Sequence, residues 1–169
     1  KEQRNIHLKQ QAFLKSNGTS PLLLALIQGK MAEATELGIK LELKEIPPSM
    51  KLSKLQEDAI LTALGNVLQN AIESLKNLAS SDKIIQLSIN DYKNHYLLEI
   101  QDNGPGIDHK LYDKIFAKGF STKEGLDRGH GLTISKKALE KINGDILLDA
   151  GDLSGACFLI IVPKGGKRL

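Results

Sequence analysis

The chain has 169 residues, of which 41% are hydrophobic and 25% are charged, values ordinary for one soluble globular domain. Its formal net charge of +3 comes without a stripe of Lys and Arg interleaved with aromatic residues, so no nucleic-acid partner is expected. No stretch approaches about 18 uninterrupted apolar residues, so no membrane-spanning helix is expected. The single cysteine, Cys157, excludes an internal disulfide, and the apolar run around it predicts a buried, inert thiol.

The first part of the chain predicts two helices and a strand. Residues 1–16 are polar with a weak apolar stripe and are compatible with a helix. A second helix is expected from Pro21 to about Leu37, because Ser20 is a suitable N-cap and Gly38 stands where a C-terminal cap belongs. Residues 39–45 alternate between apolar and polar side chains and predict a strand.

A long helix is predicted over residues 54–77. At about 100° per residue, one face is apolar and the opposite face is polar. The apolar face carries Leu64, Leu68, Ala71 and Leu75, and the polar stripe carries Asn66, Asn70, Glu73 and Asn77. The stripe is either an ordinary solvated face or a ligand site, since an Asn carbonyl is an oxygen ligand suited to Mg²⁺ and Asn is otherwise a poor helix former.

Two strands follow, over residues 84–90 and 96–101, joined by a hairpin turn in which His95 is expected to be exposed. The second strand runs into Asp-Asn-Gly-Pro-Gly at residues 102–106. This composition is typical of a turn. Alternatively, the carboxylate of Asp102 could accept a hydrogen bond from the amino group of adenine, with glycines leaving bare backbone for the flat ring.

The last third of the chain predicts a short helix over 109–116, an irregular segment over 117–130 and a helix from Gly131 that Gly144 ends. A glycine pair before a helix N-terminus suits an anion, and Lys118, Lys123 and Arg128 could meet phosphate oxygens. The alternative is a flexible surface loop with capping glycines. Residues 145–150 and Cys157–Pro163 predict two final strands.

Three motifs together are more specific than each one alone: a helix with two asparagines, a strand ending in an aspartate, and a glycine pair at a helix start. The sequence lacks a G-x-x-x-x-G-K-[ST] phosphate loop and a Rossmann G-x-G-x-x-G turn, which disfavours both of those nucleotide folds.

At these positions the chain resembles the GHKL ATPase superfamily, which includes gyrase-type topoisomerases, a heat-shock chaperone, histidine kinases and a mismatch-repair protein. Residues 66–71 resemble its N box and residues 102–106 its G1 box. Residues 116–120 resemble the F box of histidine kinases, and residues 128–132 the G2 box. Residues 118–123 and the helix over 21–38 are most similar to sensor kinases of the citrate- and dicarboxylate-sensing type.

The resemblance implies an α+β fold: a two-layer sandwich in which a mixed sheet of about five strands carries helices on one face. It implies that residues 1–18 end a dimerisation helix or linker and that 19–169 form an ATP-binding catalytic domain. It makes 117–130 a lid over the triphosphate and assigns Mg²⁺ to Asn70. The implied nucleotide-binding residues are Asn66, Asn70, Asp102, Gly104, Gly106, Ile107, Lys118, Thr122, Lys123, Arg128, Gly129, His130, Gly131 and Leu132.

The sequence departs from the family pattern at two positions. Gly155 is followed by Ala156 where the family often has Thr, so a hydroxyl that supports adenine is missing. Gyrase-like branches place a catalytic Glu four residues before the metal ligand, where this chain has Asn66, and this favours a kinase over a hydrolase. The implied reaction transfers a phosphoryl group from Mg-ATP to a histidine.

None of the four histidines lies in a recognisable acceptor motif, so the acceptor is expected outside this sequence, in a dimerisation and phosphotransfer domain of the same protein. A response regulator would be the further partner, and the domain would be cytoplasmic, without membrane contact of its own, in a membrane-anchored sensor kinase. Two alternatives remain: a degenerate module with this fold that has lost nucleotide binding, and an anti-sigma-type serine kinase, which the polar N-terminal helix disfavours.

Overall fold

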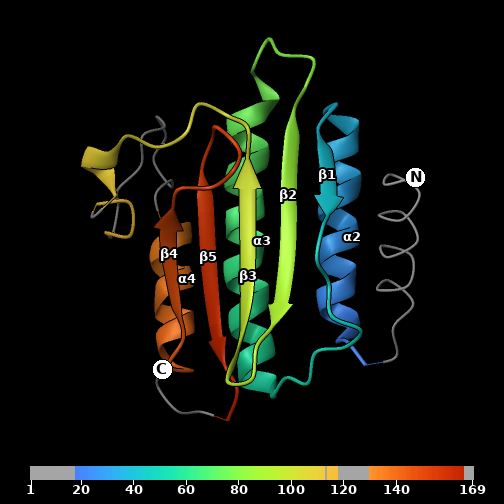
Figure 1. The fold of residues 1–169 in the computed structure, drawn as a ribbon, viewed down its shortest axis with the longest axis vertical. Coiled ribbons are helices and arrows are strands. Elements are labelled where there is room, and N and C mark those ends of the chain that lie inside the picture. The colour runs from blue at the N-terminus through green and yellow to red at the C-terminus, as the bar shows by residue number, and fades with distance from the viewer. Residues whose placement is uncertain (1–17, 113, 118–129, 166–169) are drawn as a thin grey trace.

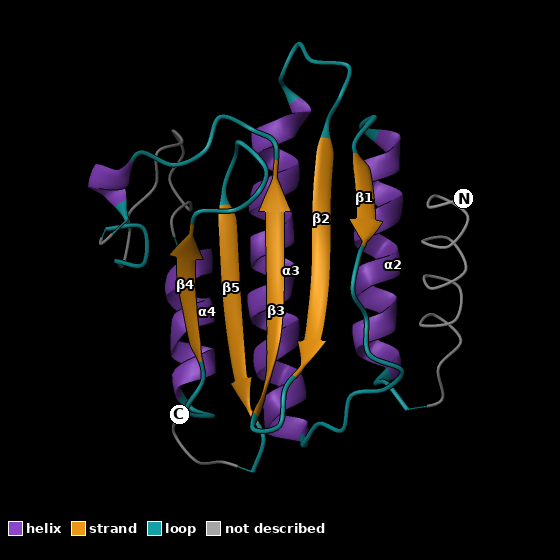
Figure 2. Ribbon diagram, viewed as in Figure 1, coloured by secondary structure: helices purple, strands orange, loops and turns teal. Residues whose placement is uncertain are grey.

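The computed structural model describes residues 18–112, 114–117 and 130–165. Within them, a five-stranded sheet carries three α-helices on one face and leaves its other face uncovered (Figures 1 and 2). The predicted two-layer α+β fold with a mixed sheet is confirmed. The helix expected over residues 1–16 lies outside the described residues. None of the described helices has the length and hydropathy needed to cross a bilayer.

Helix α2 (Pro21–Glu36) begins and ends at the predicted signals. The hydroxyl oxygen of Ser20 accepts a hydrogen bond from the backbone N–H of Leu23 at 3.3 Å, and proline occupies the first turn. Beyond the helix end, Gly38 has a φ of +68°, the left-handed conformation that glycine adopts at helix C-termini. The chain can therefore turn back directly into the first strand.

Helix α3 (Lys54–Lys76) lies behind the middle of the sheet (Figure 1). Its start is fixed by a capping box, in which the Ser53 hydroxyl accepts from the N–H of Gln56 and the Gln56 side chain accepts from the N–H of Ser53. The side chain of Gln56 also donates to the carbonyl of Pro163 at 2.6 Å, which ties the helix to the last strand. Helix α4 (Gly131–Glu140) packs beside it.

The strands lie in the order β1-β2-β3-β5-β4. They are β1 (Lys40–Leu43), β2 (Ile84–Asp91), β3 (His95–Asp102), β4 (Asp145–Asp149) and β5 (Cys157–Pro163). The β1–β2 pair is parallel, and the other three pairs are antiparallel. Strand β3 is therefore central. Its C-terminal residue lies at the same end of the strands as the β4–β5 turn.

Four local expectations need correction. Strand β1 has four residues rather than seven, although Lys44 still donates its N–H to the carbonyl of Leu87 at 2.9 Å. His95 belongs to β3 and stacks on Tyr92, with ring centroids 4.9 Å apart, so it is half-buried rather than exposed. Among the described residues of 109–116, only His109–Leu111 form a helix, and it is a short 3₁₀ turn.

The fourth correction concerns the end of α4. The helix ends at Glu140, before the stop predicted at Gly144, and Asn143 has a φ of +57°, in the left-handed region. Gly144 has a different role, because a Cβ atom there would overlap the carbonyl oxygen of Ile161. Glycine is needed at this position for the close approach of the turn to strand β5.

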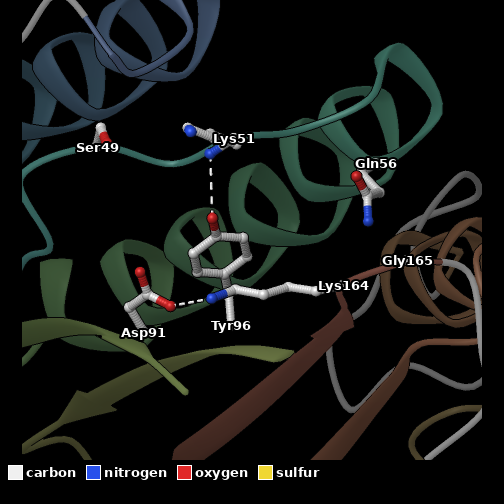
Figure 3. A pocket seen from close by; sticks show the side chains of 7 residues that line it. All are labelled: Ser49, Lys51, Gln56, Asp91, Tyr96, Lys164 and Gly165. Carbon is white, nitrogen blue, oxygen red and sulfur yellow. Dashed lines mark hydrogen bonds and ion pairs between the residues drawn. The ribbon is translucent and has the colours of Figure 1, made fainter. Parts of the chain in front are cut away.

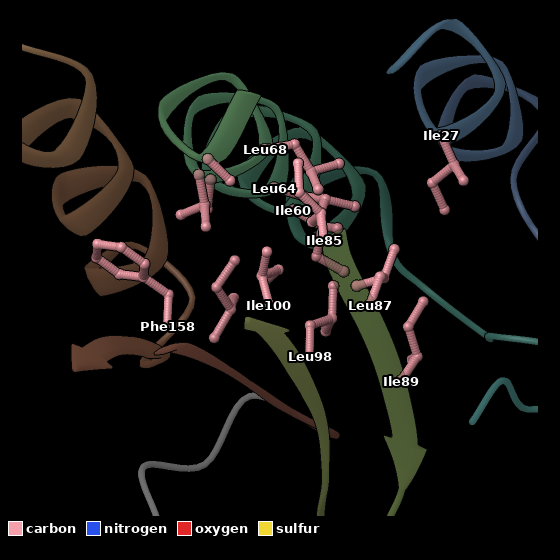
Figure 4. Close-up of a cluster of buried hydrophobic side chains, with 14 of the residues drawn as sticks. Ile27, Ile60, Leu64, Leu68, Ile85, Leu87, Ile89, Leu98, Ile100 and Phe158 are labelled. Atoms are coloured by element: carbon pink, nitrogen blue, oxygen red, sulfur yellow. The ribbon is translucent and has the colours of Figure 1, made fainter. Parts of the chain in front are cut away.

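The core lies between the sheet and the helices (Figure 4). Alternate residues of the three middle strands face α3, and the predicted apolar face of that helix meets them. The buried residues include Leu64, Leu68, Ala71 and Leu75 of α3, Ile85, Leu87 and Ile89 of β2, Tyr96, Leu98 and Ile100 of β3, and Phe158, Ile160 and Val162 of β5. The predicted core face is confirmed.

Leu68→Ala is expected to lower the free energy of unfolding by about 2–5 kcal/mol, because the fully buried side chain leaves a cavity between α3 and the sheet. Urea denaturation followed by circular dichroism measures the loss. Leu55→Ala on the same helix is the control, since the Leu55 side chain is 53% exposed, and its effect should stay within about 0.5 kcal/mol. Equal losses in both variants would contradict the assigned packing.

Candidate nucleotide site

Asp102 is the last residue of β3, and its side chain lies on the helix-covered face of the sheet, 4% exposed. Its Oδ1 accepts hydrogen bonds from two backbone N–H groups, that of Gly104 at 2.8 Å and that of Ala156 at 3.4 Å. Its Oδ2 makes no hydrogen bond to any described residue. One carboxylate oxygen is thus held by the backbone, and the other remains able to accept a hydrogen bond from a ligand.

Burial raises the pKa of the Asp102 carboxyl above its ordinary value, and the two backbone N–H groups of Gly104 and Ala156 oppose this shift only in part. The ionised carboxylate is therefore costly in the ligand-free domain. A hydrogen-bond donor at the second oxygen would lower this cost, and the amino group of a bound base is such a donor.

The turn between β4 and β5 packs directly against Asp102. The N–H of Gly155 donates to the carbonyl of Asp102 at 3.0 Å, and the N–H of Asp102 donates to the carbonyl of Ala156 at 3.0 Å. A Cβ atom on Gly155 would overlap Asp102 Oδ1, so no larger residue fits there without displacing the carboxylate. Gly155 was not among the predicted site residues, although a glycine in the turn facing the aspartate strand is a signal that could have identified it.

The two glycines after Asp102 have different roles. A Cβ on Gly104 would lie 2.8 Å from Asp102 Oδ1 and 3.0 Å from the hydroxyl of Ser74 on α3. Its missing side chain therefore makes room for protein atoms, whereas bare backbone for a ligand ring was expected. Gly106 has a φ of +73°, which strains any other residue, and it packs toward the β4–β5 turn. Ile107 follows it and packs against the core.

The two asparagines of α3 have different surroundings. The amide nitrogen of Asn66 donates to the carbonyl of Gly131 at 2.9 Å and to the hydroxyl of Ser135 at 3.0 Å, which joins α3 to the first turn of α4. One helical turn later, Asn70 is half-buried, and its amide makes no hydrogen bond to any described residue. No described residue occupies the amide oxygen of Asn70, and its predicted metal role remains a prediction.

The start of α4 is shaped by Asn66. A Cβ on Gly131 would lie 3.3 Å from the Cγ atom of Asn66, so the glycine lets the two helices approach. Ser135 strengthens this contact by donating to the Gly131 carbonyl at 2.8 Å, and the sequence analysis did not identify it. His130, the residue before the helix, is exposed and makes no side-chain capping bond, and its predicted nucleotide contact remains a prediction. Leu132 is half-buried against the core.

The described residues of the three motifs thus lie toward one end of the sheet, at the end of β3, along α3 and at the start of α4 (Figure 1). Thr133 of α4 donates to the carbonyl of Phe116 at 3.1 Å, which adds the F-box residue to the group. Lys118, Thr122, Lys123, Arg128 and Gly129 lie outside the described residues. Their predicted phosphate contacts remain predictions.

A hollow of about 440 Å³ borders this group, between the loop after Asp102 and the β4–β5 turn. It is lined by Pro105, Gly106, Ile107, Asp108, His109, Tyr112, Asp149, Ala150, Gly151, Leu153, Ser154 and Gly155. Asn66, Asn70 and Gly131 do not line it. Asp102 does not line it either, so among the described residues predicted for the site only Gly106 and Ile107 border the hollow.

A second hollow, of about 330 Å³, lies at the opposite end of the sheet (Figure 3). One of the two lysines that line it is paired, because the ammonium group of Lys164 binds the carboxylate of Asp91 and the carbonyl of Tyr92 and lies over the ring of Tyr96. The hydroxyl of Tyr96 accepts from the N–H of Lys51 at 3.0 Å. These contacts join the ends of β2, β3 and β5, and the sequence analysis expected no site there.

Cys157 is buried at the start of β5, and burial raises the pKa of its thiol to about 12, with nearby carboxylates adding to the shift. The thiolate, which is the reactive form, is therefore scarce at neutral pH. The predicted burial of the thiol is confirmed.

Residues 55–166 match the family described as histidine kinase-, DNA gyrase B-, and HSP90-like ATPase. The chain belongs to this family. Domains of this ATPase family bind ATP, and the predicted GHKL membership is confirmed.

The curated relatives include sensor kinases of the predicted kind. Sensor protein CitS of Halalkalibacterium halodurans is 39% identical over 166 residues, which cover 96% of this chain and 30% of that protein. Sensor histidine kinase DcuS of Escherichia coli is 33% identical over 153 residues, which cover 88% of this chain and 27% of that protein. The chain thus spans less than a third of the length of these relatives. The predicted similarity to citrate- and dicarboxylate-type sensor kinases is confirmed.

Solved structures of catalytic domains share the fold. The catalytic domain of histidine kinase ThkA has a TM-score of 0.69 and 24% identity, with 83% of this chain and 91% of that chain covered. The mycobacterial sensor histidine kinase MprB has a TM-score of 0.68 and 21% identity, with 84% of this chain and 93% of that chain covered.

Asp102→Asn is expected to change the pH dependence of stability in the absence of nucleotide. Because its pKa is raised, Asp102 binds its proton more tightly in the folded state than in the unfolded state. This tighter proton binding stabilises the fold fully below the ordinary aspartate pKa, and the stabilisation is lost as the pH rises through the raised value. The unfolding free energy of the variant minus that of the wild type should grow over this range and then stay level.

Urea denaturation at a series of pH values measures this difference. Asp82→Asn is the matched control, because Asp82 is exposed, and its difference from the wild type should change little with pH. A difference for Asp102→Asn that stays constant or shrinks as the pH rises would contradict the assigned environment of Asp102.

Proposed function

We propose that this domain binds Mg-ATP and transfers the γ-phosphoryl group to a histidine in a dimerisation and phosphotransfer domain of the same protein, as the catalytic domain of a sensor histidine kinase. The observation that carries the proposal is the buried Asp102 carboxylate with one oxygen fixed by backbone N–H groups and the other open to a donor. The amino group of adenine is a donor of the required kind.

Asp102 selects the base through this hydrogen bond. A guanine base presents a carbonyl oxygen where adenine presents its amino group, and two acceptors facing each other in a buried site are destabilising. Ala156 lacks the hydroxyl that the family often has at this position. It still helps to hold Asp102, because its backbone N–H donates to Asp102 Oδ1 at 3.4 Å. This argues for a working nucleotide site rather than a degenerate module.

Asn70 would hold Mg²⁺ through its amide oxygen. The fit rests on its half-buried position and on an amide that makes no hydrogen bond to described residues. Bound Mg²⁺ neutralises phosphate charge and helps to orient the triphosphate. Asn66 adds alignment by holding the start of α4 against α3.

Position 66 also bears on the type of reaction. An asparagine side chain cannot accept a proton from water as a carboxylate can, and the hydrogen bonds of Asn66 go to a serine hydroxyl and a backbone carbonyl among the described residues. Without a base at this position, the site favours transfer to a protein nucleophile over hydrolysis. Positioning and charge neutralisation then account for most of the catalysis.

The sensor kinase context is part of the proposal. Since the chain spans less than a third of its curated relatives, the acceptor histidine would lie in the remainder of the protein, and residues 1–18 would end the helix that leads to it. A response regulator would receive the phosphoryl group. The domain would be on the cytoplasmic side of a membrane-anchored protein and would itself contact neither membrane nor nucleic acid.

Asp102→Asn is expected to abolish binding of a non-hydrolysable ATP analogue while the domain stays folded, because the amide donates where the carboxylate accepted. Calorimetric titration in the presence of Mg²⁺ measures the binding, with a wild-type dissociation constant expected between about 1 µM and 1 mM. In the full-length protein, the same variant should lose ATP-dependent labelling of its histidine.

The control is Asp82→Asn, an exposed aspartate whose replacement should leave both titration and labelling unchanged. Affinity retained by Asp102→Asn would remove the residue from the adenine role. A wild-type chain that is folded, as shown by circular dichroism, and binds no nucleotide would instead support the degenerate module.

Asn70→Ala is expected to weaken binding of the ATP analogue mainly when Mg²⁺ is present, by about tenfold, because one metal ligand is lost. Titrations with Mg²⁺ and with EDTA measure the two affinities. Asn77→Ala is the matched control at the exposed end of the same helix and should bind like the wild type. Equal losses with and without metal would contradict the metal role of Asn70.

A further inference from the structure

Gln101 is a buried polar residue next to the site that the proposed chemistry leaves without a role. It precedes Asp102 on β3, so the two side chains point to opposite faces of the sheet. Asp102 lies on the helix-covered face, and Gln101 lies on the face without helices, yet it is only 6% exposed. The β4–β5 turn accounts for this burial.

The turn is hydrogen-bonded to the Gln101 side chain. Its Oε1 accepts from the N–H of Asp152 at 2.8 Å and from that of Leu153 at 3.2 Å, while its Nε2 donates to the carboxylate of Glu99. A Cβ atom on Gly151 would overlap Oε1, which shows how closely the turn approaches. Both donors of the turn and both ends of the amide are therefore satisfied.

The same turn reaches Asp102 two and three residues later. Gly155 donates to the Asp102 carbonyl at 3.0 Å, and Ala156 donates to its Oδ1 at 3.4 Å. Gln101 thus fixes one end of the turn, and the other end fixes the Asp102 carboxylate. Because Gly155 lies so close to Oδ1, a small shift of the turn must rotate the carboxylate or break its hydrogen bonds.

We infer that Gln101 is a positioning residue that orients the Asp102 carboxylate through the β4–β5 turn and so sets the preference of the site for adenine over guanine. The inference rests on the proposed function, since it needs Asp102 to contact the base. Gln101 itself touches no nucleotide: its side chain is on the opposite face of the sheet and is covered by the turn.

The test compares the affinities of the 169-residue chain for non-hydrolysable ATP and GTP analogues. Gln101→Ala should weaken binding of the ATP analogue by about tenfold and change binding of the GTP analogue by less than about twofold, so that the ratio of affinities falls. A residue that merely stabilises the fold would lower both affinities equally or neither, because both analogues bind the same folded state.

Two further variants serve as controls. Glu99→Gln keeps Gln101 and an acceptor oxygen beside it, so its affinity ratio should match the wild type. The exchange variant Glu99→Gln/Gln101→Glu keeps an acceptor for Asp152 and Leu153 and restores a donor–acceptor pair between positions 99 and 101. It should recover most of the selectivity that Gln101→Ala loses.

Hydrogen exchange of the turn amides provides the second measurement. Exchange at Asp152 and Leu153 should accelerate in Gln101→Ala and not in the exchange variant. Faster exchange with an unchanged affinity ratio would overturn the inference, because the turn would then be loosened without effect on Asp102. A wild type without nucleotide binding, or an Asp102→Asn variant that binds like the wild type, would instead overturn the proposed function.

Discussion

A charged side chain held inside the molecule sets the main constraint on this fold. Asp102 is buried at the end of the central strand, and the hydrogen bonds that stabilise its carboxylate come from the backbone. Backbone donors can reach it only if the chain approaches very closely, which explains Gly104 on one side and Gly155 on the other. The loop after β3 and the β4–β5 turn therefore have their shape because of one carboxylate. Burying that carboxylate costs free energy, and the raised pKa of Asp102 reflects this cost.

Helix α3 joins this end of the sheet to the rest of the core. Its apolar face packs on the middle strands, which fixes the rotation of the helix about its axis. That rotation places Asn66 against α4 and leaves the amide of Asn70 half-buried without a described partner. The site therefore needs no separate scaffold, since the same helix that closes the core also presents the polar side chains. Leu68 and Asn70, two residues apart, show this division between core and site.

Periodicity predicted the long helices and the strands, because burial on one face imposes a repeat of 2 or 3.6 residues on the sequence, but it failed for the short 3₁₀ turn at His109–Leu111. It predicted the α3 core face and the strand ending at Asp102, while the N-cap preference of serine predicted Ser20. It did not predict contacts made by the backbone. Gly155 and Gln101 contact backbone groups of distant segments, and Ser135 contacts the side chain of Asn66 on another helix, so no local pattern marks them. The end of α4 was misplaced for the same reason, since Gly144 is required by its approach to β5 and not by the helix.

The two sides of the site differ in how they tolerate change. The base side depends on the backbone, so Ala156 can stand where relatives of the superfamily often have threonine and still donate to Asp102. The proposed metal side depends instead on the side-chain amide of Asn70, which only another side chain could replace. Base selection should therefore respond most to residues that shape the turn, such as Gln101 and Gly155, and metal dependence to Asn70 itself. Substitutions in the β4–β5 turn can then alter base specificity without touching the ligand, because N–H groups of the turn donate hydrogen bonds to Asp102.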